Sequence, residues 1–394
     1  MGRHTCITDH ARHRHGQSGR NDHRTAPRQL RCRRWHDWQR RLAWFLCILL
    51  ACSAQSADTA RAEESTLRLA VYSASLSRDG PGILLHDILT QAPEIGAIVT
   101  VITETRPDIL LLTDIDYDAG ATALDAFRTQ LAASGVAYPY HHAPPPNSIH
   151  ITGLDLDGDG RTSSREDRQG YGRFSGDGGL ALLSRFPIRT PDIKSYSNLL
   201  WAELPDTELP ENMTPEAKAL QRLSSSSHVN IPIALPDGST LTILAYAATP
   251  PVFDDEYDRN GLRNSAETAF WEYWLDGHFG TLPDHFALMG NANLDPDRGD
   301  GRRGAIRSLL RHPALQDPLP TSQGAASMRL GGAADTVDWP EPTPANMRVS
   351  YILPARTLTV AAVGVVWPPS GSAFIKTVET AGPHRLVWTD IVIP

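Results

Sequence analysis

Oxygen-bearing side chains are spaced along residues 155–166 in a pattern that suits a hard cation. Carboxylates at alternate positions can wrap one ion, a glycine permits the tight bend, and a final glutamate can bind through both oxygens. The segment therefore predicts a structural Ca²⁺ site in a surface insertion, with a solvated acidic turn as the alternative. The predicted ligands are Asp155, Asp157, Asp159, the carbonyl of Arg161, Ser163 and Glu166, with Gly160 at the bend.

A second stretch, residues 286–296, combines an apolar run with polar groups at its end. The run closes at Gly290 and is followed by Asn291, Asn293 and Asp295. An apolar run that ends at glycine is typical of a buried strand followed by a sharp turn. A sheet that ends in this way holds its loop residues firmly enough to contact an ion or a ligand. We therefore expect a functional site at the end of this strand.

The elements that would position these residues alternate along the chain. Apolar patterns predict a strand at 66–75, a helix at 93–105, a strand at 108–114 and a helix at 121–133. This alternation favours layered α/β architecture in one domain, 63–394. Further strands are expected at 179–188, 241–247, 286–289, 348–353, 358–367 and 385–393, and a further helix at 262–275.

The N-terminal segment reads as a leader. Ten apolar residues, 42–51, follow a basic stretch that ends in Arg40 and Arg41. Ten residues are too few to cross a bilayer, which takes roughly 20. We therefore expect residues 1–62 to hold a basic leader and a signal peptide, and the protein to be periplasmic or extracellular. Residues 49–52 resemble a lipobox, so a membrane anchor through a lipidated Cys52 is the alternative.

Charge and cysteine are unevenly placed. All four cysteines lie within residues 6–52, so the body offers no disulfide, thiolate metal site or cysteine nucleophile. Residues 1–54 hold 11 Arg and 3 Asp, which leaves 26 basic and 42 acidic residues in the rest of the chain. An acidic body repels phosphate backbones, so nucleic acid is an unfavourable partner.

Five blocks of sequence carry a resemblance to a known family. They are residues 179–188 (Gly-Leu-Ala-Leu-Leu-Ser-Arg-Phe-Pro-Ile), 249–264, 286–296, 348–354 (Arg-Val-Ser-Tyr-Ile-Leu-Pro) and 384–388 (His-Arg-Leu-Val-Trp). These blocks resemble the endonuclease/exonuclease/phosphatase superfamily, in its bacterial exported branch, and follow one another in the superfamily's order; the resemblance extends from about residue 67 to the C-terminus. It implies a four-layer α/β/β/α sandwich of two mostly antiparallel sheets, with the calcium loop as an insertion.

The resemblance also implies a site at the edge shared by the two sheets. There Mg²⁺ polarises a phosphoryl group, while His and Asp side chains activate water and protonate the leaving oxygen. At the matching positions Asp114 replaces a metal-binding Glu, Asn293 is kept as a phosphate contact, and His384 is kept. Five positions are lost: Ser73 and Ala247 stand for an Asn and the catalytic His, and Asn291, Ser350 and Pro383 each stand for an Asp.

These replacements favour a degenerate phosphoesterase site with weak or no hydrolysis. Loss of one member of a catalytic unit typically costs ~10³-fold or more, and the losses do not add independently. The residual catalytic candidates are Asp114, Asn291, Asn293 and His384, with Asp114 also the residual Mg²⁺ ligand and a phosphoester the expected ligand. One alternative is an active phosphodiesterase or phosphatase with a rebuilt site, and another is a lipid-anchored interaction module. The rebuilt site would recruit carboxylates among Asp116, Asp118, Asp254, Asp255 and Asp295.

Other prominent residues have structural interpretations. Trp271 and Trp274 have the spacing of a helix face that packs on a sheet. Arg185 is expected to pair with a neighbouring acidic residue. His228 is expected to lie at the surface or at a strand edge, with a role as a ligand as the alternative, since the family branch that the chain resembles also places a His there.

Overall fold

The computed structural model describes residues 66–253, 256–340 and 344–393, all of which belong to one compact unit, Glu64–Pro394. The predicted leader and signal peptide, Cys52, Asp254 and Asp255 lie outside the described residues. Within the described part of the chain, none of the helices has the length and apolar character that crossing a membrane requires.

The first sheet has six strands in the order β10-β11-β1-β2-β4-β3. The central strands β1 (Thr66–Leu76) and β2 (Ile109–Ile115) are parallel and are joined by α3 (Pro93–Thr105), which begins and ends where the apolar spacing predicts. The other neighbours pair antiparallel. Those strands are β3 (Tyr140–His142), β4 (Gly179–Ser184), β10 (Val360–Val365) and β11 (Val387–Val392).

The second sheet has five strands in the order β5-β6-β7-β8-β9. It too has one parallel pair, β7 (Thr240–Ala247) with β8 (Phe286–Asn291), joined by α6 (Arg259–Leu275). The remaining pairs are antiparallel. The remaining strands are β5 (Lys194–Ser195), β6 (His228–Ala234) and β9 (Ser350–Pro354).

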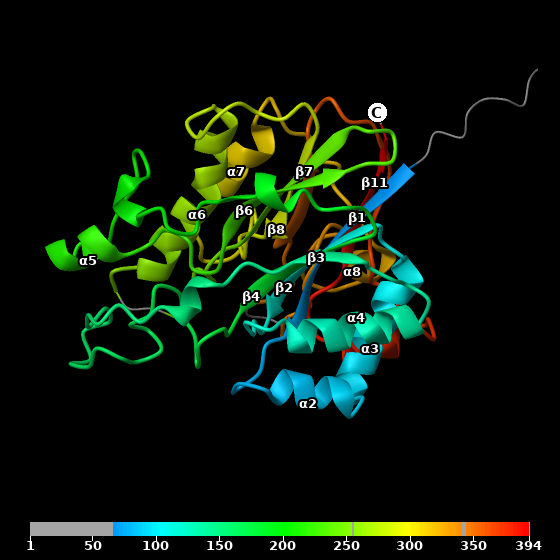
Figure 1. The fold of residues 1–394 in the computed structure, drawn as a ribbon, viewed down its shortest axis with the longest axis horizontal. Coiled ribbons are helices and arrows are strands. Elements are labelled where there is room, and N and C mark those ends of the chain that lie inside the picture. The colour runs from blue at the N-terminus through cyan, green and yellow to red at the C-terminus, as the bar shows by residue number, and fades with distance from the viewer. Residues whose placement is uncertain (1–65, 254–255, 341–343, 394) are drawn as a thin grey trace, which may run out of the picture. The chain divides into compact units, whose positions relative to one another are not determined.

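The two sheets pack face to face, with helices on their outer sides (Figure 1). Apolar side chains of β1, β2 and β4 join those of β6 to β9 in one buried cluster that continues under α6 and α7 (Gly304–Arg311). A second cluster packs α2 (Ile83–Leu89), α3, α4 (Thr122–Ala133) and α9 (Ile375–Thr380) on the other face of the first sheet. The four-layer sandwich is therefore confirmed. Short helices in the connections are η1 (Asn147–Ile149), η2 (Thr190–Asp192), η3 (Trp201–Glu203), α5 (Pro215–Leu220) and α8 (Gln323–Ala326).

The aromatic face of α6 covers the second sheet. Trp271 and Trp274 are buried, which confirms their prediction as core residues. His228 stacks on Trp271 with ring centroids 5.5 Å apart, and its ring nitrogens contact Ser224 Oγ and the Glu267 carbonyl, both at 2.9 Å. The predicted surface position of His228 is wrong, because β6 lies between β5 and β7 and α6 covers it.

Candidate functional site

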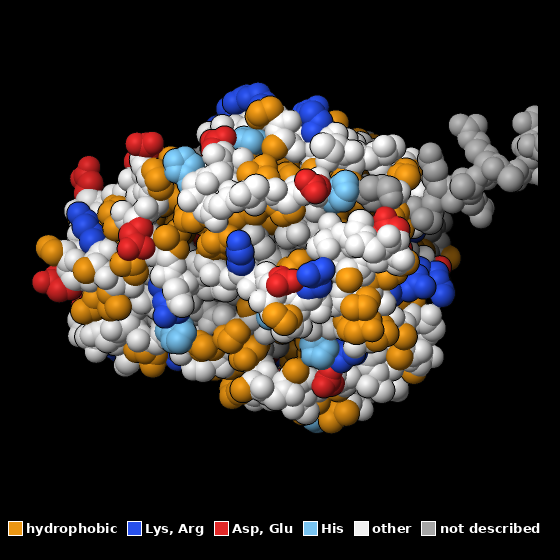
Figure 2. Space-filling model, turned by 45° about the horizontal axis from the view of Figure 1, so that its top comes forward, with side chains coloured by type: hydrophobic (Ala, Val, Ile, Leu, Met, Phe, Trp, Pro, Cys, Tyr) orange, Lys and Arg blue, Asp and Glu red, His pale blue; other side chains and the backbone are white. Residues whose placement is uncertain are grey.

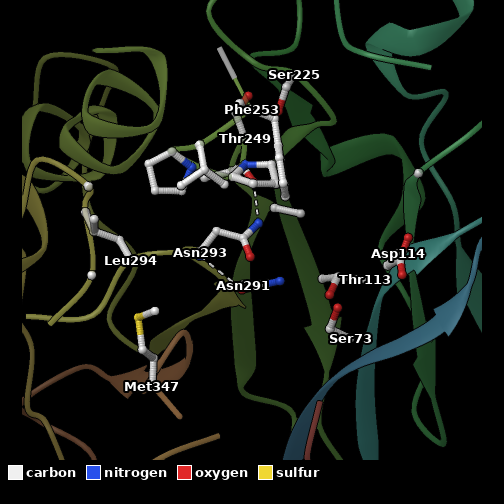
Figure 3. Close-up of a pocket in the computed structure, with 18 of the residues that line it drawn as sticks. Ser73, Thr113, Asp114, Ser225, Thr249, Phe253, Asn291, Asn293, Leu294 and Met347 are labelled. Carbon is white, nitrogen blue, oxygen red and sulfur yellow. Dashed lines mark hydrogen bonds between the residues drawn. The ribbon is translucent and has the colours of Figure 1, made fainter. Parts of the chain in front are cut away.

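A cleft of about 770 Å³ opens at one edge of the sandwich, where strands of both sheets end (Figure 3). The first sheet contributes the ends of β1 and β2, and the second contributes the ends of β7 and β8. Positions far apart in the sequence therefore meet in one cavity. Those among them that the resemblance singles out are Ser73, Asp114, Ala247, Asn291, Asn293 and His384.

The two amides are fixed by the turn that follows β8. Asn293 adopts a left-handed backbone (φ 49°), its backbone N–H donates to Asn291 Oδ1 at 3.0 Å, and its Nδ2 donates to the Ala248 carbonyl at 2.8 Å (Figure 3). Gly290 is required just before this turn, because a Cβ there would lie 2.3 Å from the backbone oxygen of Tyr246. The turn thus holds both amide side chains in fixed positions.

Asp114 stands at the end of β2 with a left-handed backbone (φ 57°), on the opposite wall from the amides (Figure 3). Burial raises its pKa, the nearby Asp177 adds to that shift, and Arg173 and Arg78 offset it. Arg173 holds Asp177 through Nε and Nη2, at 2.9 and 3.0 Å, and also pairs with Asp79. Asp177 is a cleft carboxylate that the sequence analysis missed.

His384 lines the cleft but is held as a neutral group. Burial lowers its pKa to about 4, and Arg385 adds to this shift. Its ring meets Trp339 edge-on, with centroids 5.7 Å apart and planes at 86°. Its Nδ1 has no hydrogen-bond partner in the described part of the chain. Within the described residues, no carboxylate therefore orients this imidazole through Nδ1 or stabilises its charged form.

Ser350 and Pro383, the other two positions that the resemblance assigns to aspartate, do not line the cleft. Ser350 pairs directly with Asn291 across β8 and β9 and is fully buried. Pro383 precedes His384, and its carbonyl accepts a hydrogen bond from the backbone N–H of Asp338 at 2.9 Å. These two positions are thus uncharged parts of the framework.

Asp295 also lines the cleft, but its oxygens are used by the local turn. Oδ1 accepts from the backbone N–H groups of Asp297 and Arg298, at 2.8 and 2.9 Å. Oδ2 accepts from the backbone N–H of Arg348 at 2.7 Å and from the Arg298 guanidinium at 3.3 Å. Asp295 therefore shapes the loop after β8, as an Asp-Pro turn does.

Asp116 and Asp118 lie beside a separate, small hollow. Asp118 accepts from the first backbone N–H groups of α4, those of Thr122 and Ala123, at 2.7 and 3.0 Å. Burial raises the pKa of Asp116 to about 7, and its carboxyl accepts from the backbone N–H of Arg78 at 3.2 Å. Neither residue lines the cleft, although the charges of Asp177 and Asp114 add to the raised pKa of Asp116.

Buried polar groups of α6 hold the loops of the cleft in place. The carboxylate of Glu267 accepts from the backbone N–H groups of Ser225 and Thr249, both at 2.6 Å. The amide of Asn264 donates to the carbonyls of Thr249 and Ala292, both at 2.7 Å. Asn264 belongs to a block that the resemblance identified, whereas Glu267 was missed because a lone glutamate on a helix has no distinctive spacing.

The acidic loop brings three of its predicted ligands together. One carboxylate oxygen each of Asp155, Asp157 and Asp159 lies within 4.8 Å of the others. Asp155 accepts from the backbone N–H groups of Gly158 and Gly160, at 2.7 and 2.9 Å, and both glycines adopt the left-handed backbone (φ 83°). Three hard oxygens so close together are a donor set that fits Ca²⁺. The remaining predicted ligands, Arg161, Ser163 and Glu166, follow on the same exposed loop.

The fold and the cleft define an α/β sandwich with a site at the edge of its two sheets. The sequence model of the endonuclease/exonuclease/phosphatase family matches residues 87–381. This match covers most of the chain, and the protein belongs to that family. No curated protein sequence matches the chain significantly.

Solved structures are similar to this chain at low sequence identity. An endonuclease/exonuclease/phosphatase from Beutenbergia cavernae is 16% identical with a TM-score of 0.51, over 83% of this chain and 72% of that one. A family protein from Leptotrichia buccalis is 14% identical with a TM-score of 0.48, over 83% and 100%. The human Nocturnin catalytic domain is 13% identical with a TM-score of 0.48, over 83% and 94%.

Proposed function

We propose that this protein has kept the family's cleft for binding a ligand and has lost efficient metal-dependent phosphoester hydrolysis. The observation that carries the proposal is the state of the acidic groups around the cleft. Asp177 is held by Arg173, Asp295 is held by its own turn, and burial raises the pKa of Asp114. Mg²⁺ favours several unengaged oxygen ligands in octahedral geometry. Asp114 and the neighbouring amides supply too few charged oxygen ligands to hold that ion tightly.

The replaced groups support the same proposal. Family chemistry needs a base, an orienting carboxylate and a metal to stabilise charge at the phosphoryl group. Ala247 has no proton to donate, Asn291 is uncharged, and neutral His384 has no carboxylate partner among its described neighbours. One observation favours the alternative of a rebuilt phosphoesterase site. Asp114 and Asp177 are close enough in the cleft for each charge to act on the other.

Hydrolysis assays separate these two functions. The purified protein is incubated with bis(p-nitrophenyl) phosphate or p-nitrophenyl phosphate and with Mg²⁺, Mn²⁺ or Ca²⁺. We expect rates equal to those of the His384→Ala variant, and at least ~10³-fold below those of an active enzyme. A metal-dependent rate that is lost in both His384→Ala and Asp114→Asn would establish the rebuilt site instead.

We further propose that Ca²⁺ binds the acidic loop and stabilises the fold. The three clustered carboxylates of Asp155, Asp157 and Asp159 support this. Loops of this type bind with dissociation constants of about 0.1–1 mM outside cells. At 10 mM Ca²⁺ the gain in unfolding free energy is then about 1.4–2.7 kcal/mol, so we expect Tm to rise by a few degrees. The rise should be absent in the Asp155→Asn/Asp157→Asn variant and should be smaller with Mg²⁺. An equal rise in that variant would place the effect elsewhere.

Export is part of the proposal and is supported by the basic flank and the short apolar run of residues 42–51. The intact mass of protein recovered from the exported fraction would show whether the leader is removed and whether Cys52 carries lipid.

On the face in Figure 2, the Lys and Arg side chains of the described residues are scattered among acidic and apolar ones. This distribution supports a ligand other than nucleic acid.

A further inference from the structure

The basic side chains in the wall of the cleft are already engaged by acidic ones. Arg173 pairs with Asp177 and Asp79. Arg298 pairs with Asp335 and with Asp295, and also donates to a backbone carbonyl. A phosphate in the cleft would have to break these pairs and approach their carboxylates. Without a metal ion, the cleft is therefore unfavourable for an anion.

Residues that line the cleft, by contrast, carry buried neutral polar atoms without partners in the described part of the chain. Thr113 is 1% exposed, and its Oγ1 has no hydrogen bond there. Figure 3 places its side chain between those of Ser73 and Asp114 at the wall of the cavity. Other atoms in the same condition, on residues that line the cleft, are Ser226 Oγ, Thr249 Oγ1 and His384 Nδ1. A buried hydroxyl without a partner costs free energy, and a ligand restores it when the side chain turns its oxygen to the cavity.

Aromatic side chains stand at the same cavity. Phe253 is 92% exposed and Tyr171 is 55% exposed, and both line the cleft together with Trp339. Exposed aromatic rings offer flat apolar faces, and Tyr and Trp add a polar atom at the ring edge. Hydroxyls, amides and aromatic rings around one cavity suit a ligand with both hydroxyl groups and apolar ring faces.

We propose that the cleft, whose lining residues carry unpartnered hydroxyls and exposed aromatic rings, binds an uncharged sugar without a metal ion. Each sugar hydroxyl can donate and accept, which is what Thr113, Ser226 and Thr249 require. The amides of Asn291 and Asn293 offer both functions as well. The inference rests on the proposed function, because an active phosphoesterase would need an anionic substrate and a metal here.

Paired probes test the charge argument directly. Glucose, fructose, ribose and trehalose, each alongside its monophosphate, are titrated into the full protein in EDTA, with binding followed by calorimetry and ligand-observed NMR. We expect at least one neutral sugar to bind with a dissociation constant of about 1 mM or tighter. We also expect its monophosphate to bind at least about tenfold more weakly. Binding of no neutral sugar, or tighter binding of the phosphate, would overturn the inference.

Two threonine variants test the site. Thr113→Val removes the unpartnered hydroxyl in the cleft. Thr389→Val removes one that is equally buried and unpartnered, on β11 and away from the residues that line the cleft. Neither loses a protein hydrogen bond, so both should fold. We expect roughly tenfold weaker sugar binding in Thr113→Val only; equal affinities in the two variants would contradict the assignment.

The outcomes also separate the inference from the proposed function. Sugar binding is measured in EDTA, whereas phosphoester hydrolysis needs added metal. Metal-dependent hydrolysis would refute the proposed function, and an inactive protein that binds none of the sugars would refute only the choice of ligand.

Discussion

Replacing Arg263 by methionine is expected to lower the free energy of unfolding by about 3–5 kcal/mol. Arg263 is 6% exposed on α6. Burial lowers its pKa to about 10, while the charge of Glu267 raises it. Its guanidinium donates to four backbone carbonyls, those of Leu223 (2.9 Å), Arg222 (2.9 Å), Ser224 (3.1 Å) and Gln169.

The reason for this large effect is that methionine fills the space of the side chain without donating hydrogen bonds. The carbonyls would lose a charged donor in a place that water reaches poorly, and Glu267 would lose the nearby positive charge. Urea unfolding followed by tryptophan fluorescence measures the loss. Arg189→Met is the matched control, because Arg189 forms an exposed surface pair with Asp192 and should contribute less than about 1 kcal/mol. If the Arg263 and Arg189 variants were equally stable, the hydrogen bonds from Arg263 on α6 to the neighbouring loops would not stabilise the fold.

Replacing His384 by glutamine is expected to reduce the decrease in the free energy of unfolding as the pH falls below about 6.5. The pKa of a histidine in the unfolded chain is near 6.5, whereas burial lowers that of His384 to about 4. Between these values the unfolded state binds a proton that the native state does not. The native state therefore has its full stability above about pH 6.5 and loses about 1.4 kcal/mol per pH unit as the pH falls toward 4.

His384→Gln should remove that one contribution and keep a polar side chain at the cleft. Urea midpoints at pH 7, 6, 5 and 4.5 measure the difference between the variant and the wild type. His228, whose pKa is also lowered to about 4 by burial, stays in both proteins and keeps its own contribution. Parallel stability curves for the two proteins would mean that His384 is not held neutral in the native state.

The regular elements were predictable because their apolar spacing is strong. Residues 93–105 were predicted as a helix and form α3, and 66–75 were predicted as a strand and form most of β1. Strand β6 was missed, because Pro232 stands in its middle and proline normally interrupts a strand. The structure accommodates it: β5 pairs only with Val229 and Asn230, so its ladder ends before the proline.

The candidate site was predictable only in part. Ser73, Asp114, Asn291 and His384 lie far apart in the chain, so their spacing along the sequence does not show that they meet in one cleft. Only the resemblance to the family grouped them. Asp177 and Glu267 were missed, because an isolated carboxylate shows its role only through its folded neighbours. For Asp295 the structural interpretation, a turn-forming residue, is the one that its hydrogen bonds support.

The paired salt bridges could not be read from the sequence either. Arg185 forms a salt bridge of 2.5 Å with Asp108, which confirms that it has an acidic neighbour. The sequence did not identify which acidic residue this would be. Arg173 with Asp79 joins residues that are 94 positions apart. Such pairs decide whether the basic groups of the cleft are available to an anion, so the charge state of the cleft became readable only from the folded structure.

We expect the cleft to hold no catalytic cation. Titration of the protein with Mn²⁺, with free ion followed by electron paramagnetic resonance, tests this most directly. We predict one site in the wild type and none tighter than about 1 mM in the Asp155→Asn/Asp157→Asn variant, since the acidic loop is the proposed site. A site that persists in the loop variant and disappears when Asp114→Asn is added would contradict the claim and would place a metal in the cleft.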